Sequence, residues 1–328
     1  MQRNVRPLQG AMAATGLLIL IFDSSLALEG ARSGIELCVK TVIPSLFPFF
    51  VLSAVLTDAL RLPDAKPVQI LARFLGIPAS AVSVLIPAVL GGYPVGAKSV
   101  GDLYQQKQIS RQEAQRMLAF CSNAGPSFLF GMVSGFFPEK KAVWLLWLIH
   151  ICSAALTAAA IPAAATAQQA LPPVKSMGNN SLILSSAKSM CLVCCWVVLF
   201  RILIAFLNAW VLWAFPVWVQ VFLMGLLELT NGCCSLLLIE NVNVRFILCS
   251  CMLALGGICV LFQTISVTKG LPIGCYVKGK MMQTLFSFLL SCLFVSNARL
   301  YFAGLIPILV LFLRKTQNRY GNPNAFPV

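Results

Sequence analysis

Long apolar runs alternate with short polar ones along most of the chain, and their lengths predict membrane-spanning helices. A helix needs about 20 residues to cross a bilayer, which allows roughly eight to ten membrane segments in 328 residues. The runs that are read as spans lie at 11–28, 42–60, 142–161, 182–207, 275–295 and 298–313. The pattern therefore predicts an all-α polytopic membrane protein.

Polar segments between the first spans are read as surface elements. Residues 29–40 carry charges three or four positions apart, which predicts a helix lying at the membrane interface. Residues 61–73 are polar and contain two prolines, which is typical of a connection or a surface helix.

Two apolar runs are too short to cross the membrane, and each one leads into a glycine-containing break. Residues 77–90 run into GGYPVG at 91–96, and residues 215–227 run into ELTNG at 228–232. A break frees backbone groups that hydrocarbon cannot satisfy. Broken helices are tolerated where they line a cavity or a substrate pathway, so these segments predict re-entrant hairpins.

A second break follows each hairpin after a helical segment. In the first half Ser110 and Glu113 have the spacing of a capping box, which predicts a helix from 110 to about 122. The sequence Ala124-Gly125-Pro126 then interrupts the apolar pattern. In the second half the corresponding break is Gly256-Gly257.

The order of elements in the second half repeats that of the first half. Gly96 and Gly125 are 29 positions apart, and their counterparts Gly232 and Gly257 are 25 apart. Ser99 also aligns with Ser235, Leu129 with Leu261 and Phe130 with Phe262. We therefore expect two related halves of transporter-like, inverted arrangement. The expected division is a first span at 1–30, a first repeat at 31–161, a linker at 162–180, a second repeat at 181–297, a last span at 298–313 and a basic tail at 314–328.

Composition agrees with a membrane location. Hydrophobic residues make up 59% of the chain and charged residues 10%, with a mean hydropathy of +0.87, whereas soluble domains carry about a quarter charged residues. The formal net charge of +14 comes from short connections and the chain ends, not from a nucleic-acid-binding patch. Residues 1–30 have the layout of a signal peptide, but an uncleaved first span is expected in so hydrophobic a chain. Both termini are expected to be cytoplasmic, because positive charges gather on that side, here at Arg3, Arg6, Arg314, Lys315 and Arg319.

Neither an enzyme nor a metal or cofactor site is expected. The chain has one histidine, His150, inside an apolar run, where it is expected to be packed or hydrogen-bonded. Cys191 and Cys194 have metal-like spacing but no second ligand pair. Motifs for nucleotide binding or hydrolytic catalysis are missing from the sequence.

The breaks carry the candidate binding chemistry. Half-helices that start after Gly96 and Gly125 present free N–H groups, which suit an anionic ligand. Lys98 either adds a positive charge to this site or extends to the interface. Ser122, Asn123 and Ser127 either orient a polar ligand or satisfy the freed backbone.

Glu228 is the most informative acidic residue, because it ends a long apolar run. A carboxylate in such a place is a functional candidate by default. It could carry a proton, bind a ligand or pair with Lys98, or it could reach the interface. Gln263 and Ser266 follow the last break and are expected to face the same cavity. With Glu228 as the proton-coupling residue, the expected substrate-binding residues are Gly92, Tyr93, Pro94, Gly96, Lys98, Ser122, Asn123, Gly125, Pro126, Ser127, Thr230, Asn231, Gly232, Gly257 and Gln263.

The segments GGYPVGAK, ISRQEAQRMLAFCSNAGPSFLFG and ELTNGC resemble the YlbJ/SpoVV family of sporulation integral membrane proteins. That family belongs to a wider group with a nucleoside recognition or Gate domain, and the resemblance covers about residues 43–294. It implies two halves with re-entrant hairpins, as in concentrative nucleoside transporters. It also implies a role in spore formation, in moving dipicolinic acid across the outer forespore membrane. The second half departs from the pattern, since GGICVLFQTISV lacks the Ser-Asn-x-Gly-Pro sequence of the first.

The resulting expectation is a secondary transporter or permease for a small anionic metabolite, with dipicolinic acid first on family grounds. Its partners would be that small-molecule substrate and the lipid bilayer, with no nucleic acid; a homo-oligomer is left open. Two alternatives remain, namely a non-transporting scaffold for sporulation proteins and a nucleoside permease. In each transporter case the site is expected between the two halves.

Overall fold

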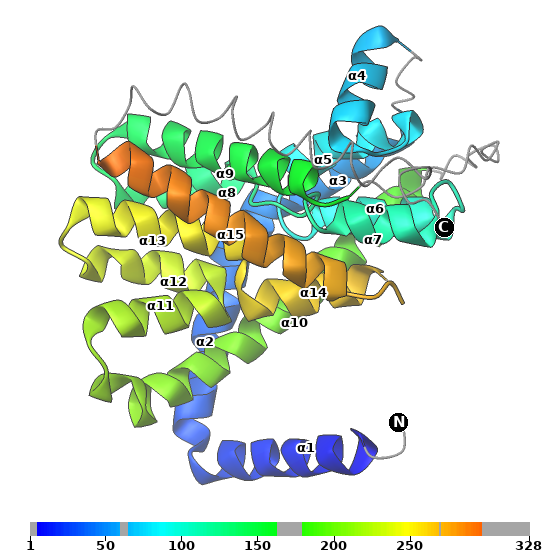
Figure 1. The fold of residues 1–328 in the computed structure, drawn as a ribbon. Coiled ribbons are helices and arrows are strands. Elements are labelled where there is room, and N and C mark those ends of the chain that lie inside the picture. Colours follow the sequence, from blue (N-terminus) through cyan, green and yellow to red (C-terminus); the bar gives the residue numbers. More distant parts are fainter. Residues whose placement is uncertain (1–4, 60–64, 163–178, 269, 297–328) are drawn as a thin grey trace, which may run out of the picture.

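The computed structural model describes residues 5–59, 65–162, 179–268 and 270–296. The predicted last span at 298–313 and the basic tail at 314–328 lie outside the described residues, as does most of the linker at 162–180. The described residues form helices and no strand (Figure 1), which confirms the all-α class.

Fifteen α-helices and five short turns of other helix types make up the described chain. The α-helices are α1 Val5–Phe22, α2 Ser24–Leu37, α3 Ile43–Ala59, α4 Lys66–Leu75, α5 Leu85–Leu90, α6 Val95–Gln105, α7 Arg111–Leu118, α8 Pro126–Gly131, α9 Lys140–Ala160, α10 Asn179–Trp210, α11 Val217–Leu227, α12 Leu229–Ser235, α13 Val242–Leu255, α14 Gly257–Thr268 and α15 Gly274–Val295. The short turns are a π-helix η1 Cys38–Val42 and the 3₁₀-helices η2 Ala79–Val84, η3 Val133–Phe136, η4 Leu212–Ala214 and η5 Leu236–Leu238.

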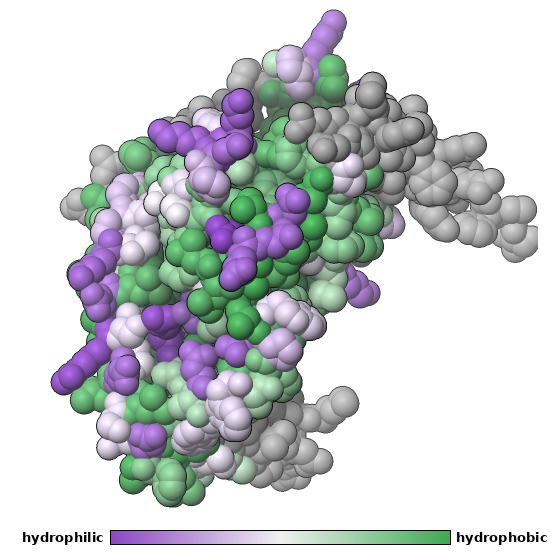
Figure 2. Space-filling model, turned by 90° about the vertical axis from the view of Figure 1, so that its left-hand side faces the viewer, coloured by the Kyte–Doolittle hydropathy of each residue, from purple (hydrophilic) through white to green (hydrophobic). Residues whose placement is uncertain are grey.

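Four described helical segments are long and apolar enough to cross a membrane, namely Ser24–Leu52, Lys140–Ala160, Ser181–Trp210 and Val242–Thr268. A fifth is possible where α4 and residues 79–90 form a pair bent by 84°. Other apolar sequence among the described residues forms shorter helices such as α11. Large apolar side chains cover much of the outside, as Figure 2 shows for one face. The protein is therefore a polytopic membrane protein.

The predicted first span at 11–28 is wrong, because the helix ends at Asp23. The Asp23 carboxylate accepts the backbone N–H of Leu26 at 3.1 Å and so begins α2, while α1 turns away from it (Figure 1). An N-cap of this kind satisfies a backbone donor at the start of the new helix. The acid therefore separates two helices instead of lying within one span.

The predicted interface helix at 29–40 is also wrong, because these residues belong to the continuous segment Ser24–Leu52. Their charges occupy its exposed side, where Lys40 pairs with Glu36 at 2.6 Å. The opposite side packs against α10 through Gly30 and Gly34, which are both buried. A Cβ atom on Gly34 would lie 2.9 Å from the Cα of Val198, so the two helices are close enough to exclude side chains.

The capping box predicted at the start of α7 is confirmed. Ser110 accepts the N–H of Glu113 at 3.2 Å, and the Glu113 carboxylate accepts the N–H of Ser110 at 2.7 Å. The helix ends at Leu118, four residues before the predicted end at 122, because the chain turns toward the second break.

Ser110→Ala should lower the free energy of unfolding by about 1 kcal/mol, since it removes the acceptor of an N-cap. Faster hydrogen exchange of the Glu113 amide would report the lost bond directly. Ser110→Thr keeps the hydroxyl and serves as the control. Equal exchange in the alanine and threonine variants would contradict the assigned cap.

Each half contains a short-helix hairpin that is closed by a glycine. In the α5–α6 hairpin a Cβ on Gly96 would lie 2.8 Å from the Cα of Ala88. In the α11–α12 hairpin a Cβ on Gly232 would lie 2.6 Å from the backbone nitrogen of Gly225. The two glycines that align in sequence thus hold the same place in their hairpins.

The second pair of aligned glycines also makes matching contacts. A Cβ on Gly125 would lie 3.1 Å from the carbonyl oxygen of Leu90, the last residue of α5. A Cβ on Gly257 would lie 3.1 Å from the carbonyl oxygen of Leu226, near the end of α11. These contacts support two related halves, and the inverted orientation of the halves stays a prediction.

Candidate functional site

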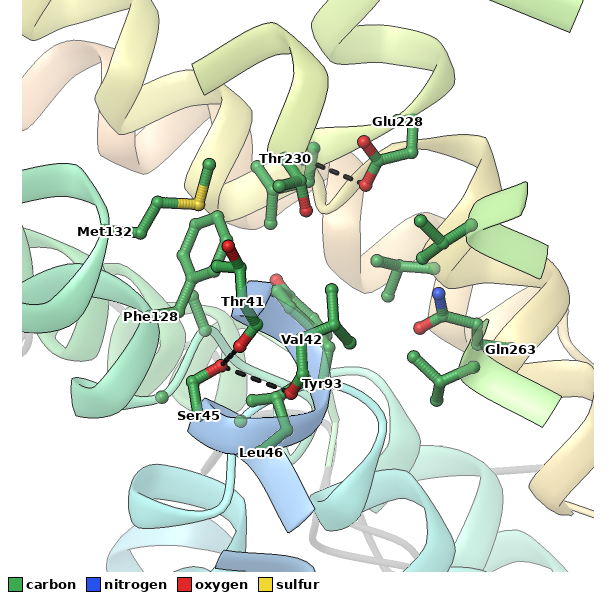
Figure 3. Close-up of a pocket in the computed structure, with 17 residues that line it drawn as sticks. Thr41, Val42, Ser45, Leu46, Tyr93, Phe128, Met132, Glu228, Thr230 and Gln263 are labelled. Atoms are coloured by element: carbon green, nitrogen blue, oxygen red, sulfur yellow. Dashed lines mark hydrogen bonds between the residues drawn. The ribbon is translucent and has the colours of Figure 1, made fainter. Parts of the chain in front are cut away.

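A cavity lies where the broken helices of the two halves meet (Figure 3). Its lining surrounds about 550 Å³ of space between atoms, including the open mouth. The described residues that line it are Thr41, Val42, Ser45, Leu46, Gly92, Tyr93, Ala124, Gly125, Phe128, Met132, Val193, Val197, Glu228, Leu229, Thr230, Val260 and Gln263. They come from the π-helix and α3, from both breaks of the first half, and from α8, α10, α12 and α14.

The two breaks of the first half touch each other at the cavity wall. A Cβ on Gly125 would lie 2.8 Å from the backbone nitrogen of Gly92, so this contact is made by bare backbone. Gly92 also has φ +76°, a conformation that side chains with a Cβ rarely adopt. Glycine is therefore required at this crossing for both space and backbone geometry.

Glu228 stabilises the break between α11 and α12 and also lines the cavity. Its carboxylate accepts the N–H groups of Thr230 and Asn231 at 2.9 and 2.7 Å, and only 2% of the residue is exposed. It therefore caps α12, and the alternative that it reaches the interface is wrong. Because its side-chain oxygens already occupy the free N–H groups at the start of α12, that helix end is not open to an anionic ligand.

The proposed pairing of Glu228 with Lys98 is also wrong. Lys98 forms an ion pair with Asp102, one helical turn away, at 2.7 Å. The positive charge that acts on Glu228 belongs to Arg201 of α10. Arg201 donates hydrogen bonds to the side chains of Asn231 and Ser33 and so connects α10 with α12 and α2.

Six of the sixteen residues predicted for the site line the cavity together: Gly92, Tyr93, Gly125, Glu228, Thr230 and Gln263. The other ten lie outside the described lining, although most flank it: Pro94, Gly96, Lys98, Ser122, Asn123, Pro126, Ser127, Asn231, Gly232 and Gly257. Ser266 is outside it too: it is half-buried and accepts the indole N–H of Trp196 at 3.1 Å.

The contribution of the π-helix and the start of α3 to the cavity was not predicted. Thr41 and Ser45 lie at the π-helical turn, and Ser45 donates to the carbonyl of Thr41 at 2.6 Å. Pro44 has no N–H for the usual helical bond, and the N–H of Ile43 bonds instead to the carbonyl of Cys38, five residues back. Single π-helical turns are frequent at functional sites. The proline pair in IPSLFPFF was the signal that could have found it.

A buried polar network behind Tyr93 was also missed. The Tyr93 hydroxyl donates to the carbonyl of Leu253 and accepts from Lys280, both at 2.9 Å. Lys280 also donates to the Gln283 side chain at 2.7 Å, and Gln283 donates to Asn123 at 3.0 Å. A lysine inside the apolar run at 275–295 was the signal for it, because charged residues within membrane helices are rare.

His150 borders this network as a hydrogen-bonded residue, as its position predicted. Its Nε2 atom accepts the backbone N–H of Ala124 at 3.0 Å, which leaves the ring proton on Nδ1. The contact attaches the second break to α9, one of the long apolar helices.

Comparisons with known proteins give one informative relative. Over 131 residues the chain is 34% identical to "Sporulation integral membrane protein YlbJ" of Bacillus subtilis (strain 168). The aligned part is 37% of this chain and 31% of that protein, so the chain covers about a third of its relative's length. Family models, that of the nucleoside recognition domain included, do not match the chain. The search of solved structures gives no match either.

The identity adds to what the helices indicate about the protein. Several long apolar helices and an integral membrane relative together support a multi-pass membrane protein. The motifs GGYPVGAK, ISRQEAQRMLAFCSNAGPSFLFG and ELTNGC pointed to the same family. The match supports membership of this chain in the YlbJ family of sporulation integral membrane proteins.

Proposed function

We propose that this protein is a secondary transporter or permease for a small anionic metabolite, with dipicolinic acid as the first candidate substrate. The observation that carries the proposal is the cavity between two sets of broken helices, lined from both halves of the chain. Transporters commonly bind their substrates where discontinuous helices of two repeats meet.

The lining suits a flat ring with polar substituents. Phe128 and Met132 present apolar surface, while Thr230 and Gln263 present polar atoms on other sides of the cavity (Figure 3). Binding sites for small molecules have this composition, a mostly apolar wall with a few placed polar groups. A pyridine ring would contact the apolar side, and its carboxyl groups would reach the amide and hydroxyl groups.

The charge of the cavity suggests that protons accompany the substrate. Among the described residues that line the cavity, Glu228 alone belongs to a charged residue type, and it is acidic. A carboxylate substrate beside an ionised Glu228 would be repelled at low dielectric. Binding would therefore favour a protonated Glu228, or a substrate that keeps one proton, and both cases couple uptake to protons.

We expect Glu228→Gln to reduce dipicolinate uptake into proteoliposomes by about tenfold, the effect of losing roughly one strong hydrogen bond. Glutamine keeps the size of the side chain and one acceptor for α12, but it cannot carry the proton. The dependence of uptake on pH should therefore become flat. The measurement is initial uptake of labelled dipicolinate over a range of external pH.

Lys98→Met is the matched control, because Lys98 pairs with Asp102 outside the cavity lining. It should leave both the rate and the pH profile of uptake at wild-type values. Wild-type uptake and pH dependence in Glu228→Gln would refute the assignment of Glu228.

The alternative functions are separated by ligand-dependent thermal stability. A ligand that binds only the folded protein stabilises it by mass action. Stabilisation by nucleosides but not by pyridine dicarboxylates would indicate a nucleoside permease. If no metabolite in the panel stabilises the protein, the scaffold hypothesis is favoured.

A further inference from the structure

Lys280 carries a buried amine, and the mechanism above does not use it. It lies on α15 with 2% of its surface exposed. Its amine donates to the Tyr93 hydroxyl and to the Gln283 side-chain oxygen, and it lies 4.8 Å from the centre of the Tyr93 ring. An ammonium group has three N–H donors, and these two bonds use two of them.

The partners of Lys280 are all neutral groups. Besides Tyr93, the titratable residues close to Lys280 are Cys121 and His150. Tyr276 lies near Tyr93. Neither of the ion pairs found among the described residues includes Lys280. A buried charge without a counter-charge costs several kcal/mol. In membrane helices such residues mark substrate or ion pathways.

Among the described residues of the cavity lining, Tyr93 is the one that also belongs to the network. It lines the cavity, and the amine of Lys280 lies against its ring and its hydroxyl. It sits in the first break between α5 and α6, where the N–H of Gly91 bonds to Pro87 and the N–H of Val95 bonds to Gly92. The Tyr93 side chain therefore connects the cavity wall with the buried amine.

We propose that Lys280 is the counter-charge for the anionic group of the substrate, and that the carboxylate takes the place of the Tyr93 hydroxyl on its amine. The inference rests on the proposed function and names the residue that makes the site selective for anions. It also supplies a positive charge for an anionic substrate, which the described lining of the cavity lacks because it has no basic side chain.

The hydrogen bonds around Lys280 explain how a ligand bound at its amine would affect other helices. Gln283 accepts from Lys280 and donates to Asn123 at the second break, while Tyr93 donates to the end of α13. A carboxylate that displaces Tyr93 from Lys280 would change the contacts of both breaks of the first half. Substrate charge would thus be sensed by both breaks of the first half.

The test is thermal stabilisation of the purified full chain by dipicolinate, by the neutral pyridine-2,6-dicarboxamide, and by benzoate, isophthalate and chloride. Lys280→Met replaces the amine with an apolar chain of similar length. We expect it to weaken dipicolinate binding on the order of thirtyfold, as for loss of one partner of a buried charge pair. Binding of the dicarboxamide should change by less than about threefold. Lys278→Met is the control, because Lys278 lies on the same helix but is exposed.

Each outcome decides the proposal. Stabilisation by other carboxylates but not by dipicolinate, lost in Lys280→Met, would support Lys280 as the anion site and reject dipicolinate as substrate. Equal anion binding in Lys280→Met and wild type would overturn the proposal and leave the transport function standing. A wild-type protein that no anion stabilises would overturn both. Equal loss for the acid and the dicarboxamide would show a structural role and also overturn it.

A second variant covers poor folding of Lys280→Met. Lys280→Gln keeps N–H donors for Tyr93 and Gln283 without the charge, so it should fold and yet show the same loss of dipicolinate binding. Wild-type dipicolinate binding in this variant would overturn the proposal.

Discussion

Gly96→Ala should prevent the protein from reaching its folded state in detergent or membranes. The added Cβ would meet the carbonyl oxygen of Cys121 and lie 2.8 Å from the Cα of Ala88. Both neighbours are backbone atoms, so no side chain can rotate away to make room. Overpacked cores usually lose about 1–3 kcal/mol, and we expect a larger loss here. The measurement is the yield of monodisperse protein and its midpoint temperature of unfolding.

Gly131→Ala is the matched control for Gly96→Ala. Gly131 ends the short helix α8, and a Cβ there would have nothing within 4 Å. Alanine at such a position is expected to be neutral or to stabilise by up to about 1 kcal/mol. A folded Gly96→Ala protein with the stability of Gly131→Ala would show that α6 does not cross α5 as described.

Arg116→Met should destabilise the fold by at least about 3 kcal/mol, since it removes a buried charged donor and leaves its acceptors unpaired. Arg116 is 4% exposed, and its guanidinium joins the end of α4 to the end of α9. It donates to the backbone carbonyls of Leu75, Gly76, Ala158, Ile161 and Pro162. Thermal unfolding of the purified variant measures the loss.

Two further variants separate the role of Arg116 from a general effect of charge. Arg116→Lys keeps the charge but has no planar fork, so it should recover only part of the stability. Arg111→Met removes an exposed arginine of the same helix and should change stability by less than about 0.5 kcal/mol. Equal effects at positions 111 and 116 would contradict the carbonyl-binding role.

Glu228 shows which properties of the site could be predicted from the local sequence and which could not. Its place after a long apolar run indicated a buried functional acid, and the residue is indeed buried and lines the cavity. Its partners were predicted less well. The carboxylate binds N–H groups two and three residues ahead, and the nearby positive charge comes from α10.

The errors in the first part of the chain have a common physical reason. A charge pattern at helical spacing fits a helix at the interface as well as one face of a helix that packs elsewhere. The buried Gly30 and Gly34 decide between them, because they bring α2 onto α10. That partner follows about 170 residues later in the sequence, and local patterns do not reveal such pairings.

The sequence by itself determined the class of the protein and the positions of its breaks. Apolar run lengths identify membrane helices because hydrocarbon requires every backbone group to be bonded within a helix. Gly and Pro mark the breaks at 91–96, 124–126 and 256–257 because Gly permits left-handed backbone and Pro cannot continue the helical hydrogen bonding. Ser110 and Glu113 likewise determined the start of α7, through contacts within one helical turn.

Only the tertiary structure decided which residues share the cavity and its polar network. Lys280 and Tyr93 are 187 positions apart, and Gln283 and Asn123 are 160 apart. Such contacts depend on how long helices pack, which is set by many small steric fits such as the bare backbone crossing of Gly92 and Gly125. These contacts leave no periodic pattern in the sequence. The sequence therefore predicts where the helices break, whereas helix packing determines which residues come together at those breaks.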